Sequence, residues 1–264
     1  MIRALYTSAT GMKAQELMID NTANNLANVN TNGFKRSQMD FADLAYLQMR
    51  QAGSNVSSST VAPIGLEIGS GVRPVGTTKL FTQGSIEQTN NPLDVAIQGD
   101  GFFKITMPDG GFRYTRDGAL RMDATGRVVT ADGYLSADNI TIPTNIIPSS
   151  LSISPTGVVS ALTQGSTTSQ IIGQLNLYTF PNPAGLSSEG DNLYSVTDAS
   201  GAEVQALPGQ NGAGTLRQQF LERSNVEVAT ELISLITAQR AYEVNARAIR
   251  AGDEMLSVTN DIVR

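Results

Sequence analysis

Carboxylates are the side chains in this sequence that could carry out catalysis. The 264 residues include no His, no Cys and no Trp, which excludes a nucleophile activated by imidazole and a zinc site with imidazole or thiolate ligands. Two carboxylates can still hydrolyse a glycoside together. Most surface carboxylates only contact water and catalyse nothing. An acidic, β-rich glycosidase is therefore an alternative interpretation of this sequence, not the one we favour. The candidates lie close together in the sequence: Asp94, Asp100, Asp117 and Asp123.

Motifs and charge do not indicate a second kind of chemistry. The Gly-rich lysine loop that binds nucleotide phosphates, the dinucleotide-binding GxGxxG motif and the Asp-rich loop of EF-hand calcium sites do not occur. The net charge is −6, and no Lys or Arg lies between Arg127 and Arg217, whereas binding of nucleic-acid phosphates needs a basic surface. We therefore expect no catalytic, cofactor-binding or metal-binding residue, no cofactor, no nucleic acid and no small-molecule substrate.

The sequence does not predict a membrane anchor. It contains no run of 18 apolar residues, and a membrane-spanning helix needs about 20. The stretch from Ala4 to Met12 includes Thr7, Thr10 and Gly11, which makes it too polar for the core of a secretory signal peptide. We expect a protein that stays in the cytosol or leaves it without a cleaved signal.

The middle of the chain predicts β structure. Short apolar runs such as Phe102–Ile105 are separated by Asp-Gly pairs. Asp-Gly favours type I′ hairpin turns, because both central residues of such a turn need a positive φ angle. We predict an antiparallel β domain with about eight or more short strands over residues 76–205. The four pairs are Asp100-Gly101, Asp109-Gly110, Asp117-Gly118 and Asp132-Gly133.

Both ends of the chain carry apolar residues at a seven-residue period, which indicates helices with a narrow apolar seam. They would cover about residues 1–30 and 225–262, and Ser224 and Glu227 have the spacing of a capping box. One interpretation is that each of these helices packs against a domain of its own chain. Polar residues interrupt both seams and would fix register and partner, so we expect association with other helices. The predicted assembly interface is Leu5, Met12, Ile19, Leu26, Val228, Leu232, Leu235, Tyr242, Ile249 and Leu256.

A polar segment separates the first helix from the β domain. Gln51–Pro63 is rich in Ser, Gly, Asn and Thr, and such a composition does not order alone. We expect this segment to become ordered only against a neighbour. The predicted division is a terminal helical domain (1–36 and 223–264), a connecting layer (37–75 and 206–222) and an antiparallel β domain (76–205).

Three motifs resemble those of one known family. Residues 23–36, ANNLANVNTNGFKR, are similar to the N-terminal signature of the axial proteins of the bacterial flagellum, which form its rod and hook. Residues 91–103, NPLDVAIQGDGFF, followed by YTRDG at 114–118, resemble the central motif of that family. Residues 224–256, which begin SNVEVATELISLITAQRAYEVNARAI, resemble its C-terminal helix. The motifs lie in the family's order and span nearly the whole chain.

The resemblance implies an α+β fold. Its long N- and C-terminal helices would form an innermost, coiled-coil-like domain, and its central antiparallel all-β domain would form the outer wall. The helices would face each other within one subunit or between neighbours. The facing sets would be Leu5, Met12, Ile19 and Leu26 on one helix, and Leu232, Leu235, Tyr242 and Ile249 on the other.

The resemblance also implies a structural function rather than catalysis. Members polymerise helically into a stiff, hollow drive shaft that transmits torque from motor to hook. Residues 66–97 are most similar to the distal-rod branch, and a proximal-rod or hook-type member is the alternative. The implied partners are further copies of the chain, proximal rod proteins and hook protein along the axis, surrounding P- and L-ring proteins, and the flagellar type III export apparatus. The implied location is the basal-body rod across the periplasm, after export without a cleaved signal peptide.

Overall fold

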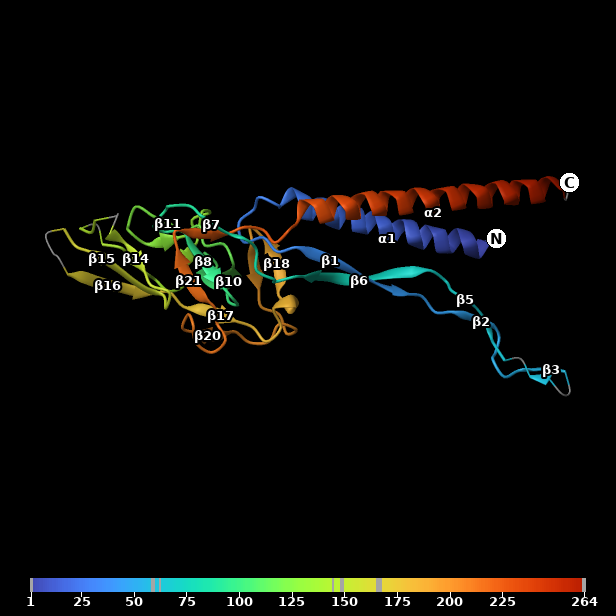
Figure 1. Cartoon of the computed structure of the whole chain (residues 1–264), viewed down its shortest axis with the longest axis horizontal. Coiled ribbons are helices and arrows are strands. Elements are labelled where there is room, and N and C mark those ends of the chain that lie inside the picture. The colour runs from blue at the N-terminus through green and yellow to red at the C-terminus, as the bar shows by residue number, and fades with distance from the viewer. Residues whose placement is uncertain are drawn as a thin grey trace. The chain divides into compact units, whose positions relative to one another are not determined.

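The chain folds into two compact units. The computed structural model describes residues 2–57, 60–61, 63–143, 145–147, 150–164 and 168–262. We call residues 1–26, 37–78 and 227–264 the helical unit, and residues 27–36 and 79–226 the β unit. Terminal helices and a central antiparallel β domain are both present (Figure 1), which confirms the α+β class. The division into three layers stays a prediction.

Two long helices make up most of the helical unit. α1 (Ile2–Ala27) and α2 (Val228–Ile262) contain no Pro to interrupt them. The predicted capping box is wrong, because α2 begins after both of its residues. Ser224 instead accepts a hydrogen bond from the N–H of Val226 at 3.3 Å. Glu231 places a negative charge in the first turn of α2, where the positive end of the helix dipole lies.

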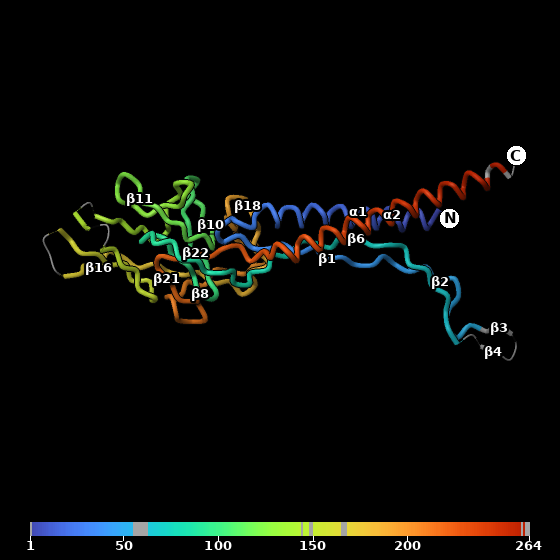
Figure 2. Tube along the Cα trace, turned by 45° about the horizontal axis from the view of Figure 1, so that its top comes forward, coloured from blue at the N-terminus to red at the C-terminus, as the bar shows by residue number. Residues whose placement is uncertain are grey.

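Two-stranded ribbons complete the helical unit. Their strands are β1 (Ser37–Asp43), β2 (Leu47–Arg50), β3 (Asn55–Ser57), β4 (Thr60–Val61), β5 (Leu66–Ile68) and β6 (Val72–Lys79). β1 pairs with β6, β2 with β5 and β3 with β4, so the ribbons follow one another along the chain (Figure 2). α1 holds the first ribbon, since Thr10 Oγ1 accepts a hydrogen bond from Val72 N–H (3.4 Å) and the Asn21 amide donates to the Ser37 carbonyl (2.8 Å).

Antiparallel strands build the β unit. They are β7 (Ile86–Gln88), β8 (Val95–Gln98), β9 (Phe103–Thr106), β10 (Phe112–Thr115), β11 (Arg121–Met122), β12 (Val128–Val129), β13 (Leu135–Ser136), β14 (Ser152–Ile153), β15 (Val158–Leu162), β16 (Ser169–Gln174), β17 (Leu177–Thr179), β18 (Ser187–Gly190), β19 (Leu193–Ser195), β20 (Val204–Ala206), β21 (Thr215–Gln218) and β22 (Phe220–Glu222). One sheet has the order β11-β12-β13-β9-β10-β19-β18, and another has the order β14-β15-β16. The remaining pairs are β17 with β20, β8 with β21 and β7 with β22.

Two groups of apolar side chains form the interior of the β unit. The larger group is mostly aliphatic and includes the fully buried Val95, Ile97 and Leu177. The smaller group is aromatic, and in it Tyr114 and Phe180 meet edge to face with ring centroids 4.9 Å apart. Edge-to-face contacts add stability beyond the buried area. The β unit therefore has an apolar core of its own.

Three-residue loops, rather than type I′ turns, close the hairpins at two of the four Asp-Gly pairs, whereas Asp100-Gly101 and Asp117-Gly118 connect strands that do not pair with each other. Between β9 and β10, Gly110 N–H bonds to the Met107 carbonyl (3.0 Å) and Met107 N–H bonds to the Gly111 carbonyl (2.9 Å). Gly110 has a φ of 83°, whereas Asp109 has no positive φ. Gly133 makes the same pattern between β12 and β13. The type I′ prediction was wrong because a loop of this length needs a positive φ at one residue only.

A buried ion triad ties residues 27–36 to the rest of the β unit. Lys35 Nζ lies 2.6 Å from Glu222 Oε1, and Arg116 Nε lies 3.2 Å from Glu222 Oε2. Lys35 also donates to the Thr82 carbonyl (2.7 Å), and Arg116 donates to the Gly101 carbonyl (2.7 Å). Burial, together with the nearby Arg116 charge, lowers the pKa of Lys35 from its ordinary value. The segment after α1 is therefore held by Glu222, the last residue of strand β22.

Candidate assembly surfaces

α1 and α2 lie side by side and antiparallel in the helical unit (Figures 1 and 2). Two glycines allow this close approach. A Cβ atom at Gly11 would lie 3.0 Å from Asn245 Nδ2, and one at Gly252 would lie 2.6 Å from Leu5 Cδ2. The contacts move toward the C-terminus on α1 as they move toward the N-terminus on α2. The two helices therefore form a pair within one chain.

A buried polar junction fixes the register of this helix pair. Asn25 is fully buried on α1, and its Nδ2 donates to the Ser37 carbonyl (2.8 Å) and to Glu231 Oε2 on α2 (3.3 Å). Asn25 Oδ1 accepts the Ser37 N–H at 2.9 Å. Buried polar groups select one register, because a shifted helix would leave them without partners. No local sequence pattern predicts the contact between Asn25 and Glu231, because the two residues lie 206 positions apart in the chain.

The residues of the predicted assembly interface divide into two groups. Those that are exposed in the chain are Val228, Leu232 and Tyr242. Those that are half-buried are Leu5, Met12, Ile19, Leu26, Leu235, Ile249 and Leu256. Because Leu5 contacts Gly252 of the same chain, partial burial here arises at least in part from the internal helix pair. A contact between copies needs surface that this pair leaves uncovered.

The ribbon of β2 and β5 exposes large apolar side chains. Tyr46 and Met49 on one side of the hairpin and Ile64 and Leu66 on the other are all exposed. A two-stranded ribbon is only marginally stable in water by itself, and large exposed apolar patches mark surfaces that bind a partner. The ribbon is therefore a second candidate assembly surface.

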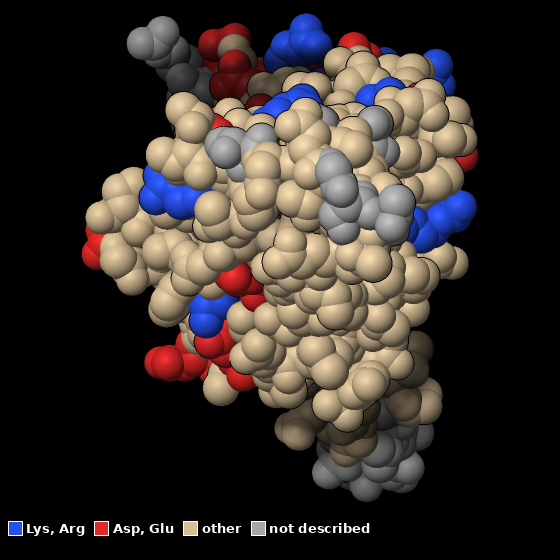
Figure 3. Space-filling view, turned by 90° about the vertical axis from the view of Figure 1, so that its left-hand side faces the viewer, with Lys and Arg blue, Asp and Glu red and all other residues tan. Residues whose placement is uncertain are grey.

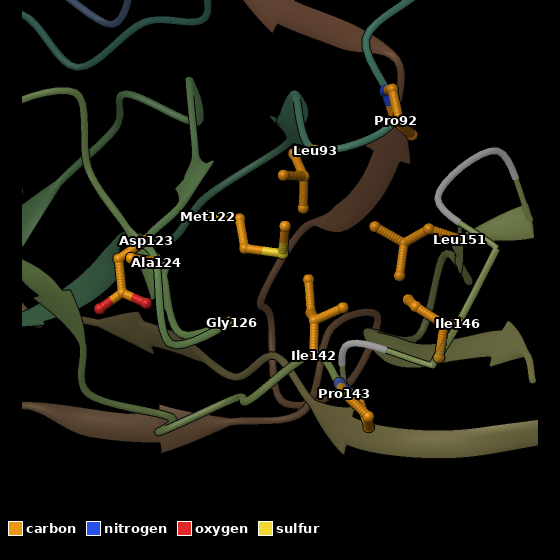
Figure 4. A pocket seen from close by; sticks show the side chains of 10 residues that line it. All are labelled: Pro92, Leu93, Met122, Asp123, Ala124, Gly126, Ile142, Pro143, Ile146 and Leu151. Carbon is orange, nitrogen blue, oxygen red and sulfur yellow. The ribbon is translucent and has the colours of Figure 1, made fainter.

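An apolar cavity of about 160 Å³ lies in the β unit. Figure 4 shows Leu93, Met122 and Ile142 directed toward a common centre, while the carboxylate of Asp123 points away from it. Asp123 instead accepts hydrogen bonds from Thr125, and these bonds lower the pKa of its carboxyl group from the ordinary value. The cavity therefore offers no acid or base to a substrate.

Two of the other three candidate carboxylates also serve local structure. Asp94 is buried and accepts a hydrogen bond from Asn91 Nδ2 (2.8 Å). Asp117 accepts the Ala119 N–H (3.0 Å), and burial raises its pKa from the ordinary value. Asp100 is exposed and lines a different cavity. Of the four, only Asp123 lines the cavity in Figure 4, so the structure does not assemble them into a catalytic pair there.

Charge and metal-binding groups do not define a site either. The face in Figure 3 is largely uncharged, and its Lys and Arg side chains are scattered rather than gathered in a stripe. Among the described residues, no group of three or more acidic side chains is placed to hold a metal ion. None of the described helices is both long and apolar enough to cross a membrane.

Three protein families match successive parts of the chain. Residues 5–35 match the flagella basal body rod protein family. Residues 96–161 match the D1 domain of the flagellar hook protein FlgE/F/G family, and residues 217–262 match the C-terminal region of the flagellar basal body rod FlgEFG proteins. The matches therefore include most of α1, much of the β unit and all of α2.

Relatives match over almost the whole chain. The flagellar basal-body rod protein FlgG of Buchnera aphidicola from Schizaphis graminum is 49% identical over 97% of this chain and 98% of its own. FlgG of Borreliella burgdorferi is 45% identical over the full length of both chains, and FlgG of Bacillus subtilis is 38% identical over 97% of each. The chain belongs to the flagellar basal-body rod protein family. As a member, it is a structural subunit of the distal rod in the basal body and not an enzyme.

Proposed function

We propose that the chain polymerises helically into a stiff, hollow shaft that transmits torque from the motor to the hook. The apolar side chains exposed by the helical unit, on both helices and on the β2–β5 ribbon, support this proposal. Neighbouring copies would remove this apolar surface from water, and burial is favourable by about 25 cal/mol per Å². One contact repeated head to tail gives an open helical array.

In the proposed shaft, each unit has one position. The helices line the central channel, the ribbons of residues 37–78 connect neighbouring copies, and the β unit forms the outer wall. Proximal rod proteins and hook protein contact the two ends, and P- and L-ring proteins surround the wall across the periplasm. The chain reaches this place unfolded through the type III export apparatus, without a cleaved signal peptide. The absence of Cys supports this route, because no disulfide has to be reduced before an unfolded chain passes.

Removal of the helical ends tests polymerisation. The full chain is compared with a fragment of residues 27–226, which retains the ion triad and the cores of the β unit. We expect filaments from the full chain in electron microscopy, and a folded, monomeric fragment in circular dichroism and sedimentation. A full chain that stays monomeric at every concentration, or a fragment that still forms filaments, would contradict the proposal.

A further inference from the structure

Two Asn-Gly pairs occur in the chain, and at such pairs an asparagine side chain can react with its own backbone. The pairs are Asn32-Gly33 and Asn211-Gly212. In this reaction the backbone nitrogen of the second residue attacks the side-chain amide carbon of the first. Glycine favours the attack, because it has no Cβ atom to hinder the approach and leaves the backbone free to rotate. The sequence alone does not distinguish the two pairs.

The fold protects Asn32-Gly33. The Gly33 N–H donates a hydrogen bond to the Glu222 carbonyl (2.8 Å), and the Asn32 carbonyl accepts one from Asn192 Nδ2 (3.0 Å). Gly33 is buried, and a Cβ atom there would lie 2.7 Å from the backbone nitrogen of Asp117. The nitrogen that would attack is therefore already bonded, and the packed backbone leaves no room for it to turn toward the Asn32 side chain.

Asn211-Gly212 lies in an exposed turn between β20 and β21. The two residues have φ angles of 51° and 79°, and the Ala213 N–H donates to the Gln210 carbonyl (2.9 Å), as in a type I′ turn. A Cβ atom at Gly212 would have no atom within 4 Å beyond its chain neighbours. In the part of the chain that the structure describes, no group accepts a hydrogen bond from the Gly212 N–H. The attacking nitrogen is therefore free and has open space around it.

The two sites also differ in what must open before the reaction. At Asn211 only the exposed turn has to loosen. At Asn32 the backbone must leave Glu222, whose side chain also holds Lys35 Nζ at 2.6 Å. Exposed turns open at a small free-energy cost, whereas buried segments open only near global unfolding. Identical dipeptides should therefore react at very different rates in the folded chain.

We propose that Asn211 is a site of spontaneous deamidation in the folded protein and that Asn32 is not. The Gly212 nitrogen loses its proton and bonds to Cγ of Asn211. The Cγ–Nδ2 bond breaks, and ammonia leaves with a proton, so that a five-membered succinimide ring remains. Water then adds to either ring carbonyl and opens the ring to aspartate or isoaspartate. Water is the only other reactant.

Deamidation changes both the charge and the backbone of this turn. A carboxylate replaces a neutral amide, and in the isoaspartate form the backbone runs through the side chain and gains one carbon. Asn211 lines a cavity of about 280 Å³ together with Asp100 and Arg116, so the new charge arises at the edge of that cavity. The site belongs to the β unit. A subunit that stays in place would therefore gain negative charge there as it ages.

Incubation of the purified chain near neutral pH, followed by peptide mapping in a mass spectrometer, tests the proposal. The exchange of an amide for a carboxyl group changes the mass of the peptide, and chromatography separates the isoaspartate form. In the folded chain we expect Asn211 to convert at least about tenfold faster than Asn32, because only the exposed turn opens readily. In urea, where both sites are unfolded, we expect similar rates.

Two glycine substitutions in the same loop provide a matched pair. Gly209 and Gly212 both have a positive φ, of 81° and 79°, but only Gly212 follows an asparagine. Gly212→Ala should slow deamidation of Asn211, because its Cβ atom hinders the attack, whereas Gly209→Ala should not slow it. Circular dichroism checks that both variants fold.

Conversion of Asn32 as fast as Asn211 in the folded chain, or equal slowing by both alanines, overturns the inference. The same holds if Asn211 converts in urea but stays unchanged in the folded chain. All of these measurements use the unassembled chain. Failure of the chain to form filaments would therefore contradict the proposed function and leave this inference standing.

Discussion

Charged side chains in this protein serve packing in two different ways. Lys35, Arg116 and Glu222 are buried and form ion pairs with one another inside the β unit, whereas Arg240 and Arg247 stay exposed on α2. A buried charge is costly to leave alone, so the first group stabilises the fold only while it is complete. An exposed charge contributes little until a partner arrives. The same residue types thus contribute differently to stability inside the subunit and on its surface.

Glu222→Gln tests the buried triad. The amide keeps the size of the side chain but leaves the Lys35 and Arg116 charges buried without a counter-charge. We expect the free energy of unfolding of the β unit to fall by about 3–5 kcal/mol. Urea denaturation followed by circular dichroism measures this change.

Glu87→Gln is the matched control, because it breaks the exposed ion pair between Glu87 and Arg223. We expect this variant to unfold at the urea concentration of the unchanged chain, since exposed pairs contribute little. Equal destabilisation by the two variants would show that the buried triad stabilises the fold no more than an exposed ion pair does.

Among the strands of the β unit, one close backbone approach depends on a glycine. Gly118 and β8 are joined by a hydrogen bond from the Val95 N–H to the Gly118 carbonyl (3.0 Å). A Cβ atom at Gly118 would lie 1.7 Å from the Val95 carbonyl oxygen. No side chain fits there unless the strand moves.

Gly118→Ala should therefore destabilise the β unit by about 3 kcal/mol, near the upper end of overpacking costs. Gly76→Ala in β6 is the control, because a Cβ atom there has no other atom within 4 Å. We expect the control to unfold at the same temperature as the unchanged chain or slightly above it. Thermal unfolding of both variants decides the matter, and a tolerated alanine at Gly118 would contradict the predicted strand contact.

Sequence patterns predicted helices and strands better than they predicted contacts. The seven-residue rows predicted both terminal helices, because the period of apolar residues follows the geometry of one helix. The pairing of Asn25 with Glu231 joins residues far apart in the chain, and no local period encodes it. The Asp-Gly pair at Asp109 predicted a hairpin correctly but gave the wrong turn, since a glycine suits several loops with a positive φ. The roles of the predicted interface residues in assembly stay predictions.

For the whole molecule, hydrogen exchange can show whether the ribbon orders on assembly. β2 and β5 form an isolated two-stranded ribbon with exposed side chains, so we expect their amides to exchange fast in the monomer. Contacts with neighbouring copies should slow this exchange strongly in filaments. Mass spectrometry of exchanged peptides compares the two states.

β9 provides the internal reference for that measurement. It lies between β13 and β10 in the seven-stranded sheet, and its amides should exchange slowly in both states. Slow exchange of β2 and β5 already in the monomer would mean that the ribbon needs no neighbour, and would remove it from the assembly surfaces.

The ion triad also affects when the chain can finish folding. Lys35 and Glu222 are 187 positions apart, and a chain that emerges from its N-terminus, as during synthesis, exposes Lys35 long before its partner arrives. Until then the lysine has no counter-charge, and the nascent β unit lacks its closing strand. Completion of this unit is thus deferred until almost the entire polypeptide is free, as the proposed export of an unfolded chain requires.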